Sequence, residues 1–276
     1  MILAQTTESQ SGNAPTLKHS PSRRGSFIQI FTPRGHEWNT YELGIPNLPG
    51  VLEGFRIVHI SDMHFHAWWS PVYDQLIERI NSAQADLLLF TGDFNERKLD
   101  PGPAQPSIRR FVEPLKAKYG RYAIVGNHDV ELARPFLPSL GLTMMDERRE
   151  MVADLPIELI GLPGTDRIDL NLAWLASLPR KSPELLRIVM SHYPDHLKRT
   201  ALSADLFLAG HTHGGQICLP GGRPILTHDT LPRQMCKGVH RVGDTWLIVS
   251  RGIGFATIPV RLFCPPELIE IRLVRS

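Results

Sequence analysis

The sequence predicts a single domain of the α/β class. Five runs of apolar, β-type residues are bounded by glycine, serine or threonine, and such runs are typical of strands buried on both faces. Helical patterns lie between them, so strand, loop and helix alternate. The chain has 276 residues, 42% of them hydrophobic, which is enough for one core of this kind. The expected strands span 55–60, 86–90, 122–125, 186–190 and 206–209.

The connecting elements follow from local signals. After the first run, Ser70-Pro71 offers an N-cap and a first-turn proline, and apolar residues at 72, 76, 77 and 80 share one helix face. A further helix is expected near Leu170 to Leu178. The segment from Gly35 to Glu53 alternates irregularly before a turn rich in Pro and Gly, which favours an edge strand. No repeat or internal linker divides the chain.

A short polar motif directly follows each predicted strand. The motifs are Asp62-Met63-His64, Gly92-Asp93, Gly126-Asn127-His128-Asp129, Ser191-His192 and Gly210-His211-Thr212-His213-Gly214-Gly215-Gln216. In α/β sheets ligands bind beyond the carboxyl ends of the strands, where all five motifs fall. Each motif alone is weak evidence, because such short patterns occur in unrelated loops. Together they predict a two-metal site at one edge of a sheet.

The residue types suit a pair of divalent ions. A carboxylate can bridge ions about 3.5–4 Å apart, which a neutral imidazole cannot, so Asp93 is the expected bridge. Mixed oxygen and nitrogen ligands without thiolate favour Mn, Fe or Zn over Ca, and they leave the choice among these ions open. With Asp62, Asp93 and a bridging hydroxide bound, the two ions keep a net charge of about +1, which attracts a phosphate group.

The five motifs resemble those of the calcineurin-like metallophosphoesterases, which run D-x-H, G-D, G-N-H-[DE], H and G-H-x-H. The resemblance covers roughly residues 55–275. It implies a four-layer α/β/β/α sandwich with two mixed sheets. It also implies dinuclear-metal-dependent hydrolysis by in-line attack of a metal-bridging hydroxide. The motif 210–216, with Pro46-Asn47-Leu48-Pro49 and residues 249–254, is similar to a bacterial subgroup of predicted phosphohydrolases within this family.

The resemblance also implies a role for each motif residue. The first metal would be held by Asp62, His64 and His213, the second by Asn127, His192 and His211, and both by Asp93. Asn127 would in addition contact the substrate. His128 would stay unliganded and protonate the leaving group or stabilise the transition state as a cation. Asp129 would orient His128, or instead cap a helix that begins at this residue.

Substrate contacts are harder to predict from the sequence. His66, Trp68 and Trp69 follow the first motif and are expected at the mouth of the site, where the tryptophans either meet a base or acyl chain or pack under the loop. Arg251 is the candidate phosphate contact, because Gly252 and Gly254 let backbone approach a ligand. About sixty residues separate His128 from His192, fewer than a typical domain, so no cap domain is expected.

An uncapped groove favours a phosphodiester or pyrophosphate substrate, nucleotide or lipid-linked. A phosphomonoesterase is the first alternative, and a non-catalytic scaffold of the same fold is the second. Protein phosphatase activity is not expected, because relatives with that activity carry Asp-Arg-Gly after the second motif, whereas Gly92-Asp93 is followed here by Phe94-Asn95-Glu96.

Charge and cysteine usage exclude several partners. The net charge of +2 gives no argument for nucleic acid. A basic cluster of Lys18, Arg23, Arg24 and Arg34 indicates a solvated tail, with a DNA or membrane contact as the alternative. The three cysteines lack CxxC spacing, so neither a disulfide framework nor a zinc ribbon is indicated. No protein partner is indicated by the sequence.

The N-terminal segment indicates where in the cell the protein is expected. Residues 1–25 read as a disordered lead to a metallophosphoesterase domain over 26–276, and no apolar stretch approaches the ~18 residues of a transmembrane segment. Arg23-Arg24 resembles a twin-arginine export signal, but the apolar run after it is too short. We therefore expect a cytoplasmic enzyme, with peripheral membrane contact as an alternative.

Overall fold

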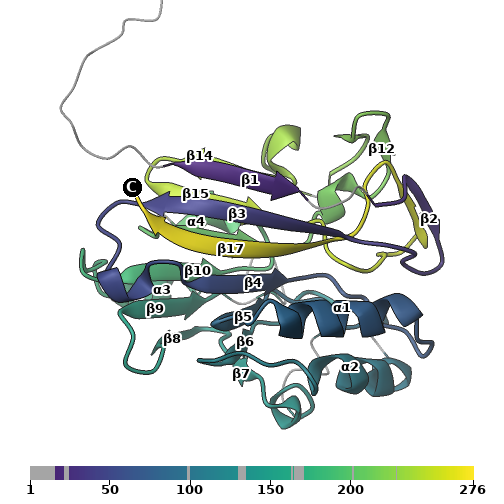
Figure 1. Ribbon diagram of the computed structural model, residues 1–276, viewed down its shortest axis with the longest axis horizontal. Coiled ribbons are helices and arrows are strands. Elements are labelled where there is room, and N and C mark those ends of the chain that lie inside the picture. Colours follow the sequence, from purple (N-terminus) through teal and green to yellow (C-terminus); the bar gives the residue numbers. More distant parts are fainter. Residues whose placement is uncertain are drawn as a thin grey trace, which may run out of the picture.

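Two mixed β-sheets packed face to face form the centre of the molecule in the computed structural model (Figure 1). The structure describes residues 16–21, 25–97, 100–129, 135–162, 164, 171–200, 202–227 and 229–276. Within these residues, seven strands form the first sheet and six form the second. The five polar motifs lie where parallel strands of the two sheets end.

The first sheet has the strand order β1-β3-β17-β4-β5-β6-β7. Its strands are β1 (Leu17–Pro21), β3 (Glu37–Ile45), β17 (Glu267–Arg275), β4 (Arg56–Ile60), β5 (Leu87–Phe90), β6 (Arg121–Ala123) and β7 (Thr143–Met144). The neighbours from β4 to β7 are parallel, whereas β17 runs antiparallel to β4 and parallel to β3. The sheet is therefore mixed.

Strand β3 corrects one sequence prediction. The segment from Gly35 to Glu53 was expected to supply an edge strand, but β3 lies between β1 and β17. The edge is β1, whose residues pair with β3 over Leu17–Pro21 inside the predicted disordered lead. The alternation in this short stretch is too weak to predict a strand, and pairing with β3 supplies its order. Residues 1–15 and 22–24 of the predicted lead lie outside the described residues.

The second sheet has the order β14-β15-β11-β10-β9-β8. It consists of β14 (Gly238–Val242), β15 (Thr245–Val249), β11 (Leu206–Ala209), β10 (Leu186–Met190), β9 (Ile157–Gly161) and β8 (Arg148–Met151). The four central strands are parallel, and the two outer ones are antiparallel to their neighbours. This sheet is also mixed.

Alternating side chains place apolar residues on both faces of the strands. Leu87 and Leu89 of β5 pack between the two sheets, where they meet Ile188 of β10. Leu88 and Phe90 point the other way and pack under the helices α1 (Pro71–Ser82) and α2 (Gln105–Val112) (Figure 1). On the far side of the second sheet, a further core includes residues of α3 (Leu172–Ser177) and α4 (His196–Thr200). The predicted four-layer sandwich is confirmed.

The helix after the first motif begins where the sequence predicts. The Ser70 hydroxyl accepts a hydrogen bond from the Val72 amide at 3.4 Å, and Pro71 is the first helical residue. Tyr73, Leu76 and Ile80 are buried against the first sheet. The helix therefore covers this sheet on the side away from the second.

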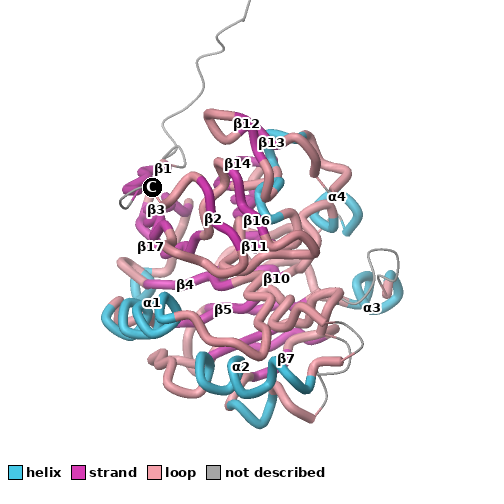
Figure 2. Tube along the Cα trace, turned by 90° about the vertical axis from the view of Figure 1, so that its right-hand side faces the viewer, coloured by secondary structure: helices cyan, strands magenta, loops and turns pink. Residues whose placement is uncertain are grey.

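Two small antiparallel ribbons lie above the edge where the strands end (Figure 2). One pairs β2 (Ile28–Ile30) with β16 (Val260–Leu262), and the other pairs β12 (Cys218–Leu219) with β13 (Arg223–Pro224). Among the described residues, no helix has the length and apolarity that crossing a bilayer requires.

Candidate metal centre

The loops after the strands turn sharply at the predicted ligands. Five of these residues adopt left-handed backbone conformations: Asp62 (φ 47°), His64 (φ 43°), Asp93 (φ 55°), His211 (φ 67°) and His213 (φ 50°). Residues other than glycine rarely adopt this region, and such strain is typical of functional sites. This left-handed backbone turns the side chains of the predicted ligands toward one another.

Asp62, His64 and His213 form the first donor group. His64 Nε2 lies 3.0 Å from His213 Nε2, and His213 Nε2 lies 3.3 Å from Asp62 Oδ1. All three side chains are buried, and their ligand atoms lie within 4.8 Å of one another. This group could hold a metal ion.

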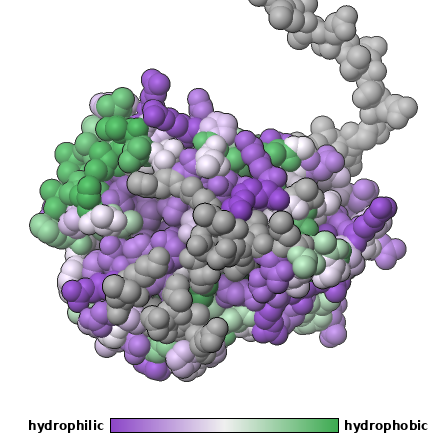
Figure 3. All heavy atoms as spheres, turned by 180° about the vertical axis from the view of Figure 1, so that it is seen from behind, coloured by the Kyte–Doolittle hydropathy of each residue, from purple (hydrophilic) through white to green (hydrophobic). Residues whose placement is uncertain are grey.

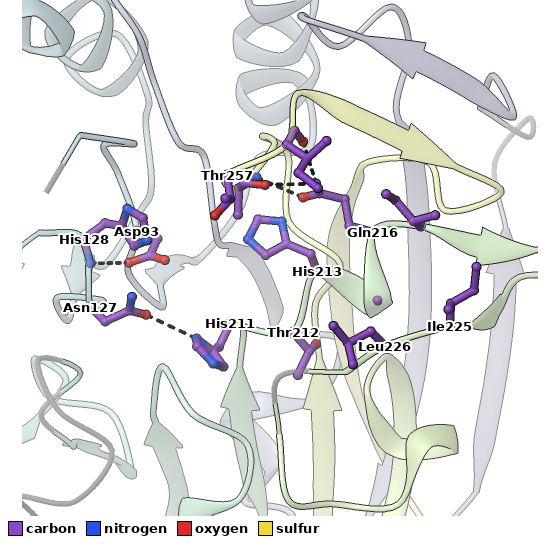
Figure 4. Close-up of a pocket in the computed structure, with 14 residues that line it drawn as sticks. Asp93, Asn127, His128, His211, Thr212, His213, Gln216, Ile225, Leu226 and Thr257 are labelled. Carbon is purple, nitrogen blue, oxygen red and sulfur yellow. Dashed lines mark hydrogen bonds between the residues drawn. The ribbon is translucent and has the colours of Figure 1, made fainter.

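Asn127, His192 and His211 form the second donor group. Asn127 Oδ1 lies 2.9 Å from His192 Nε2 and 3.2 Å from His211 Nδ1 (Figure 4). The Nδ1 atom of His192 donates to the Thr91 carbonyl at 2.8 Å, so the lone pair of the neutral ring lies on Nε2. That lone pair faces the other donors, as a metal ligand requires.

Asp93 contacts both groups. One carboxylate oxygen, Oδ2, lies 3.3 Å from His64 Nε2 and 3.3 Å from His192 Nε2. The other oxygen, Oδ1, accepts a hydrogen bond from the His128 amide at 2.9 Å. The donor set comprises two carboxylates, one amide oxygen and four imidazoles, and one of the carboxylates, Asp93, is shared by both groups. Such a set fits a pair of divalent cations.

Charge is concentrated in this buried cluster. Burial raises the pKa of Asp62 and Asp93, but the neighbouring imidazoles, His213 for Asp62 and His192 for Asp93, hold both values below their ordinary range. Burial lowers the pKa of His64 and His192, yet the adjacent carboxylates raise these to about 10 and about 9. The carboxylates are therefore ionised at neutral pH and attract cations.

A chain of buried hydroxyl groups supports Asp62. Ser61 Oγ donates to Asp62 Oδ2 at 2.6 Å, and Thr91 Oγ1 donates to Ser61 Oγ at 2.7 Å. Because each hydroxyl has one proton, His59 Nε2 must donate to Thr91 Oγ1 across 2.8 Å. On the other side, Gly252 has a φ of +69°, and a Cβ there would lie 2.5 Å from Asp62 Cβ.

Glu96 supports both His64 and His128, and its role was not predicted from the sequence. Its Oε2 lies 2.6 Å from His64 Nδ1, which leaves Nε2 of His64 for the metal site. Its backbone carbonyl accepts a hydrogen bond from His128 Nδ1 at 2.6 Å. The only sequence signal for Glu96 was an acidic residue in the loop directly after Gly92-Asp93.

Arg261 is a second residue whose role was not predicted. Its side chain is fully buried, and Nη2 lies 3.1 Å from His213 Nδ1. The same guanidinium donates to the carbonyls of Arg251 and Gly254 at 2.6 and 2.7 Å. It holds the His213 ring on the side away from Asp62. No motif points to it, since it lies 48 residues from His213 in the chain.

Asp129 does not orient the His128 ring in the way the sequence suggested. Its Oδ1 accepts from the amides of Phe94 and Asn95 at 2.8 and 3.3 Å, and its Oδ2 accepts from the Gly126 amide at 2.9 Å. Burial and the charge of Asp93 raise its pKa to about 7. Asp129 thus ties the loop of Asp93 to its own loop. The helix that it was expected to cap belongs to the segment 129–133, of which residues 130–133 lie outside the described part.

Arg251 does not reach the site. Its Nη2 lies 2.6 Å from both Glu37 Oε2 and Glu267 Oε2, and its side chain is 11% exposed. These two carboxylates come from β3 and β17, a pairing that the sequence did not indicate. Arg251 therefore stabilises the fold between these strands. Gly252 and Gly254 approach the loop of Asp62 and Met63 instead of a substrate.

The residues after the first motif divide into two kinds. Trp68 is 51% exposed and stacks on His66 with ring centroids 4.2 Å apart, beside a second hollow that both residues line. Trp69 packs under the loop instead, since its Nε1 donates to Asp74 at 2.9 Å and Arg110 lies over its ring. The packing alternative therefore describes Trp69 but not Trp68.

A cavity of about 490 Å³ opens beside the donor groups. Asp93, Asn127, His128, His211 and His213 line one side (Figure 4). The opposite wall is apolar and consists of Ile217, Ile225, Leu226, Ala256 and Ile258. A ligand in this cavity would meet polar donors at one end and hydrocarbon at the other.

Comparisons with known proteins agree with this geometry. The family model for calcineurin-like phosphoesterases matches residues 55–215, more than half of the chain. Metallophosphoesterase YkuE of Bacillus subtilis (strain 168) is 30% identical over 255 residues, covering 90% of this chain and 88% of YkuE. Phosphodiesterase YaeI of Escherichia coli (strain K12) is 28% identical over 231 residues, covering 80% of this chain and 82% of YaeI. The chain therefore belongs to the calcineurin-like phosphoesterase family.

Proposed function

We propose that this protein hydrolyses a phosphodiester or pyrophosphate bond with two divalent metal ions. The observation that carries the proposal is the position of Asp93 Oδ2, 3.3 Å from a histidine of each donor group. Asp62, His64 and His213 would hold one ion, Asn127, His192 and His211 the other, and Asp93 both. Mn, Fe and Zn all suit these donors.

When bound, the ions would supply Lewis acidity for the phosphoryl oxygens and an activated water as nucleophile. His128 would act on the leaving group. Its Nδ1 is fixed by the Glu96 carbonyl, and the residue lines the cavity, so Nε2 is the atom available to give a proton. Asn127 lines the same cavity and would also contact the phosphate.

The shape of the cavity supports a substrate with a second substituent on the phosphate. The donors occupy one side, and the apolar wall of Ile225, Leu226 and Ile258 extends away from them. That wall favours a lipid-linked substituent over a free phosphate monoester, because a monoester would leave it without contact. The phosphodiesterase name of the Escherichia coli relative agrees with this choice. His66 and Trp68, in the neighbouring hollow, are candidate contacts for a polar headgroup or a base.

The test compares two chromogenic substrates. Metal-stripped protein is reconstituted with Mn and assayed on bis-p-nitrophenyl phosphate and p-nitrophenyl phosphate. We expect metal-dependent turnover that favours the diester. The variant Asp93→Asn should lose it, whereas Asp205→Asn, which changes a carboxyl near Lys181 and outside the site, should keep it.

Two outcomes would contradict the proposal. Preference for the monoester would indicate a phosphomonoesterase. Absence of turnover on both esters and on a panel of lipid-linked diesters and pyrophosphates, with two ions bound, would indicate a scaffold.

A further inference from the structure

Exposed apolar side chains gather at one end of the molecule. The described residues include twelve large hydrophobic side chains that are exposed, and eight of them belong to three chain segments that meet there. The green region of Figure 3 lies at the end that carries β2 and β12 in Figure 1. We call this set the apolar face: Phe27, Ile28, Ile30, Phe31, Leu219, Ile225, Leu226 and Ile258.

Backbone pairing makes the apolar face continuous. Strand β2 pairs with β16, with Ile28 opposite Leu262 and Ile30 opposite Val260. The Phe31 amide donates to the Pro259 carbonyl at 2.7 Å, which joins β2 to the segment of Ile258. Ile217 bridges to Leu262, and the Ile225 amide donates to the Ile217 carbonyl at 3.3 Å. Segments far apart in the sequence therefore form one surface.

The apolar face continues the wall of the cavity. Ile225, Leu226 and Ile258 line the cavity together with Asp93 and His213, yet they are 50%, 58% and 53% exposed. These three residues belong to both surfaces. Whatever covers the apolar face also stands at the entrance to the metal centre.

The three chain segments that form the apolar face carry only positive charge. The segments 27–34, 217–226 and 255–263 contain no Asp or Glu. Arg34 and Arg223 are exposed beside the apolar residues. The backbone N–H of Arg34 donates a hydrogen bond to Gln29 Oε1 at 2.9 Å, which holds Arg34 near β2, and Arg223 pairs with Leu219. Apolar side chains with arginines at their rim are complementary to an anionic bilayer, where the apolar side chains enter the interface and the arginines meet the headgroups.

We propose that the apolar face docks on the surface of an anionic lipid bilayer and opens the cavity toward it. The substrate would then be a phosphoester or pyrophosphate that is itself anchored in the bilayer. This second part rests on the proposed hydrolytic function, whereas the docking does not. A bilayer is favoured over a protein partner or a second copy because the cavity with the metal donors opens within the face, and a protein seated there would close it.

Vesicle flotation tests the docking. The full chain is mixed with vesicles of phosphatidylcholine, with or without phosphatidylglycerol. We expect it to float with the anionic vesicles, and the double variant Ile28→Ser/Phe31→Ser to bind about tenfold or more weakly, since two large apolar side chains no longer enter the bilayer. Arg34→Glu/Arg223→Glu should lose binding to the anionic vesicles.

The matched control is Val51→Ser/Met151→Ser, which removes two exposed apolar side chains outside the apolar face and should float like the parent chain. Turnover of bis-p-nitrophenyl phosphate should be unchanged in all three double variants, because none of the six residues lines the cavity. That soluble assay, together with the panel of lipid-linked substrates, reports the hydrolytic function separately from the docking. Vesicle binding by a chain that turns over none of these substrates would support the docking and reject the hydrolytic function.

Absence of flotation by the parent chain, or an equal loss in the control variant, would overturn the proposal. Dimerisation that Ile28→Ser/Phe31→Ser abolishes, measured by light scattering, would assign the apolar face to a second copy of the chain and also overturn it.

Discussion

His64 Nδ1 and Glu96 Oε2 lie 2.6 Å apart, which makes Glu96 the support of one imidazole in the first donor group. Glu96 Oε1 is held in turn by the Thr257 amide at 2.9 Å. The backbone carbonyl of the same residue fixes the His128 ring. One loop residue thus links a candidate metal ligand to the candidate acid, and its side chain and backbone can be tested apart.

Glu96→Ala is expected to weaken metal binding by roughly 10–100-fold, because the His64 ring loses the partner that orients it. Glu96→Gln keeps an oxygen that can accept from Nδ1 and should remain close to the parent chain. Calorimetric titration of the stripped proteins with Mn measures both. Equal affinities for the Ala variant and the parent chain would show that Glu96 does not support the metal site.

His128→Ala is expected to lower turnover by about 10²–10⁴-fold, the usual contribution of general acid catalysis. Both ions should stay bound, because the proposed ligand set does not include His128, whose Nδ1 is held by the Glu96 carbonyl. The loss should be larger for diphenyl phosphate than for bis-p-nitrophenyl phosphate, since phenol is the poorer leaving group. A variant that loses metal would make His128 a ligand, and a loss independent of the leaving group would exclude the role of acid.

Arg251→Met is expected to destabilise the fold by about 3–5 kcal/mol, because it leaves the buried carboxylate of Glu267 without its cation. The KM for the diester should not change, since Arg251 does not line the cavity. Urea unfolding and steady-state kinetics on the same protein separate the two effects. The exposed control Arg180→Met should change neither value. A raised KM with unchanged stability would restore Arg251 as a phosphate contact.

The buried side chain of His36 should make the stability of the fold depend on pH. Burial, and then the charge of Arg79, lower the pKa of His36 to about 4, and neither ring nitrogen has a hydrogen-bond partner among the described residues. The unfolded chain therefore binds a proton near the ordinary pKa of about 6.5, while the folded chain does not. Stability should fall as the pH decreases from about 6.5 to about 4.

The variant His36→Phe should show a shallower loss over this range, measured by thermal unfolding of metal-free protein at several pH values. Identical pH profiles for the variant and the parent chain would contradict the account of His36.

The sequence predicted the parts of the site that depend on local order. Asp62 and Asp93 follow neighbouring parallel strands of the first sheet, and such strands end at one edge, so their proximity could be predicted. His192 follows β10 of the second sheet, and its approach to Asp93 depends on how the two sheets pack. The left-handed backbone of Asp62 and Asp93 could not be predicted, because local propensity disfavours it and only the surrounding packing enforces it.

The residues that support the site depend on contacts between distant segments. Arg261 reaches His213 across 48 residues, and Arg251 meets Glu37 across 214. Neither contact leaves a periodic or motif signal, which is why Arg251 was predicted to bind substrate and Arg261 was not predicted at all. The apolar face could likewise not be predicted from the sequence, because its three segments become neighbours only when β2 pairs with β16.

The proposed hydrolysis needs two ions bridged by Asp93, and titration of the metal-stripped chain with Mn tests this requirement. Turnover of bis-p-nitrophenyl phosphate is followed against the number of ions bound per chain. We expect turnover to rise to its full value only when two ions are bound. Full turnover with one ion, or without any, would contradict it.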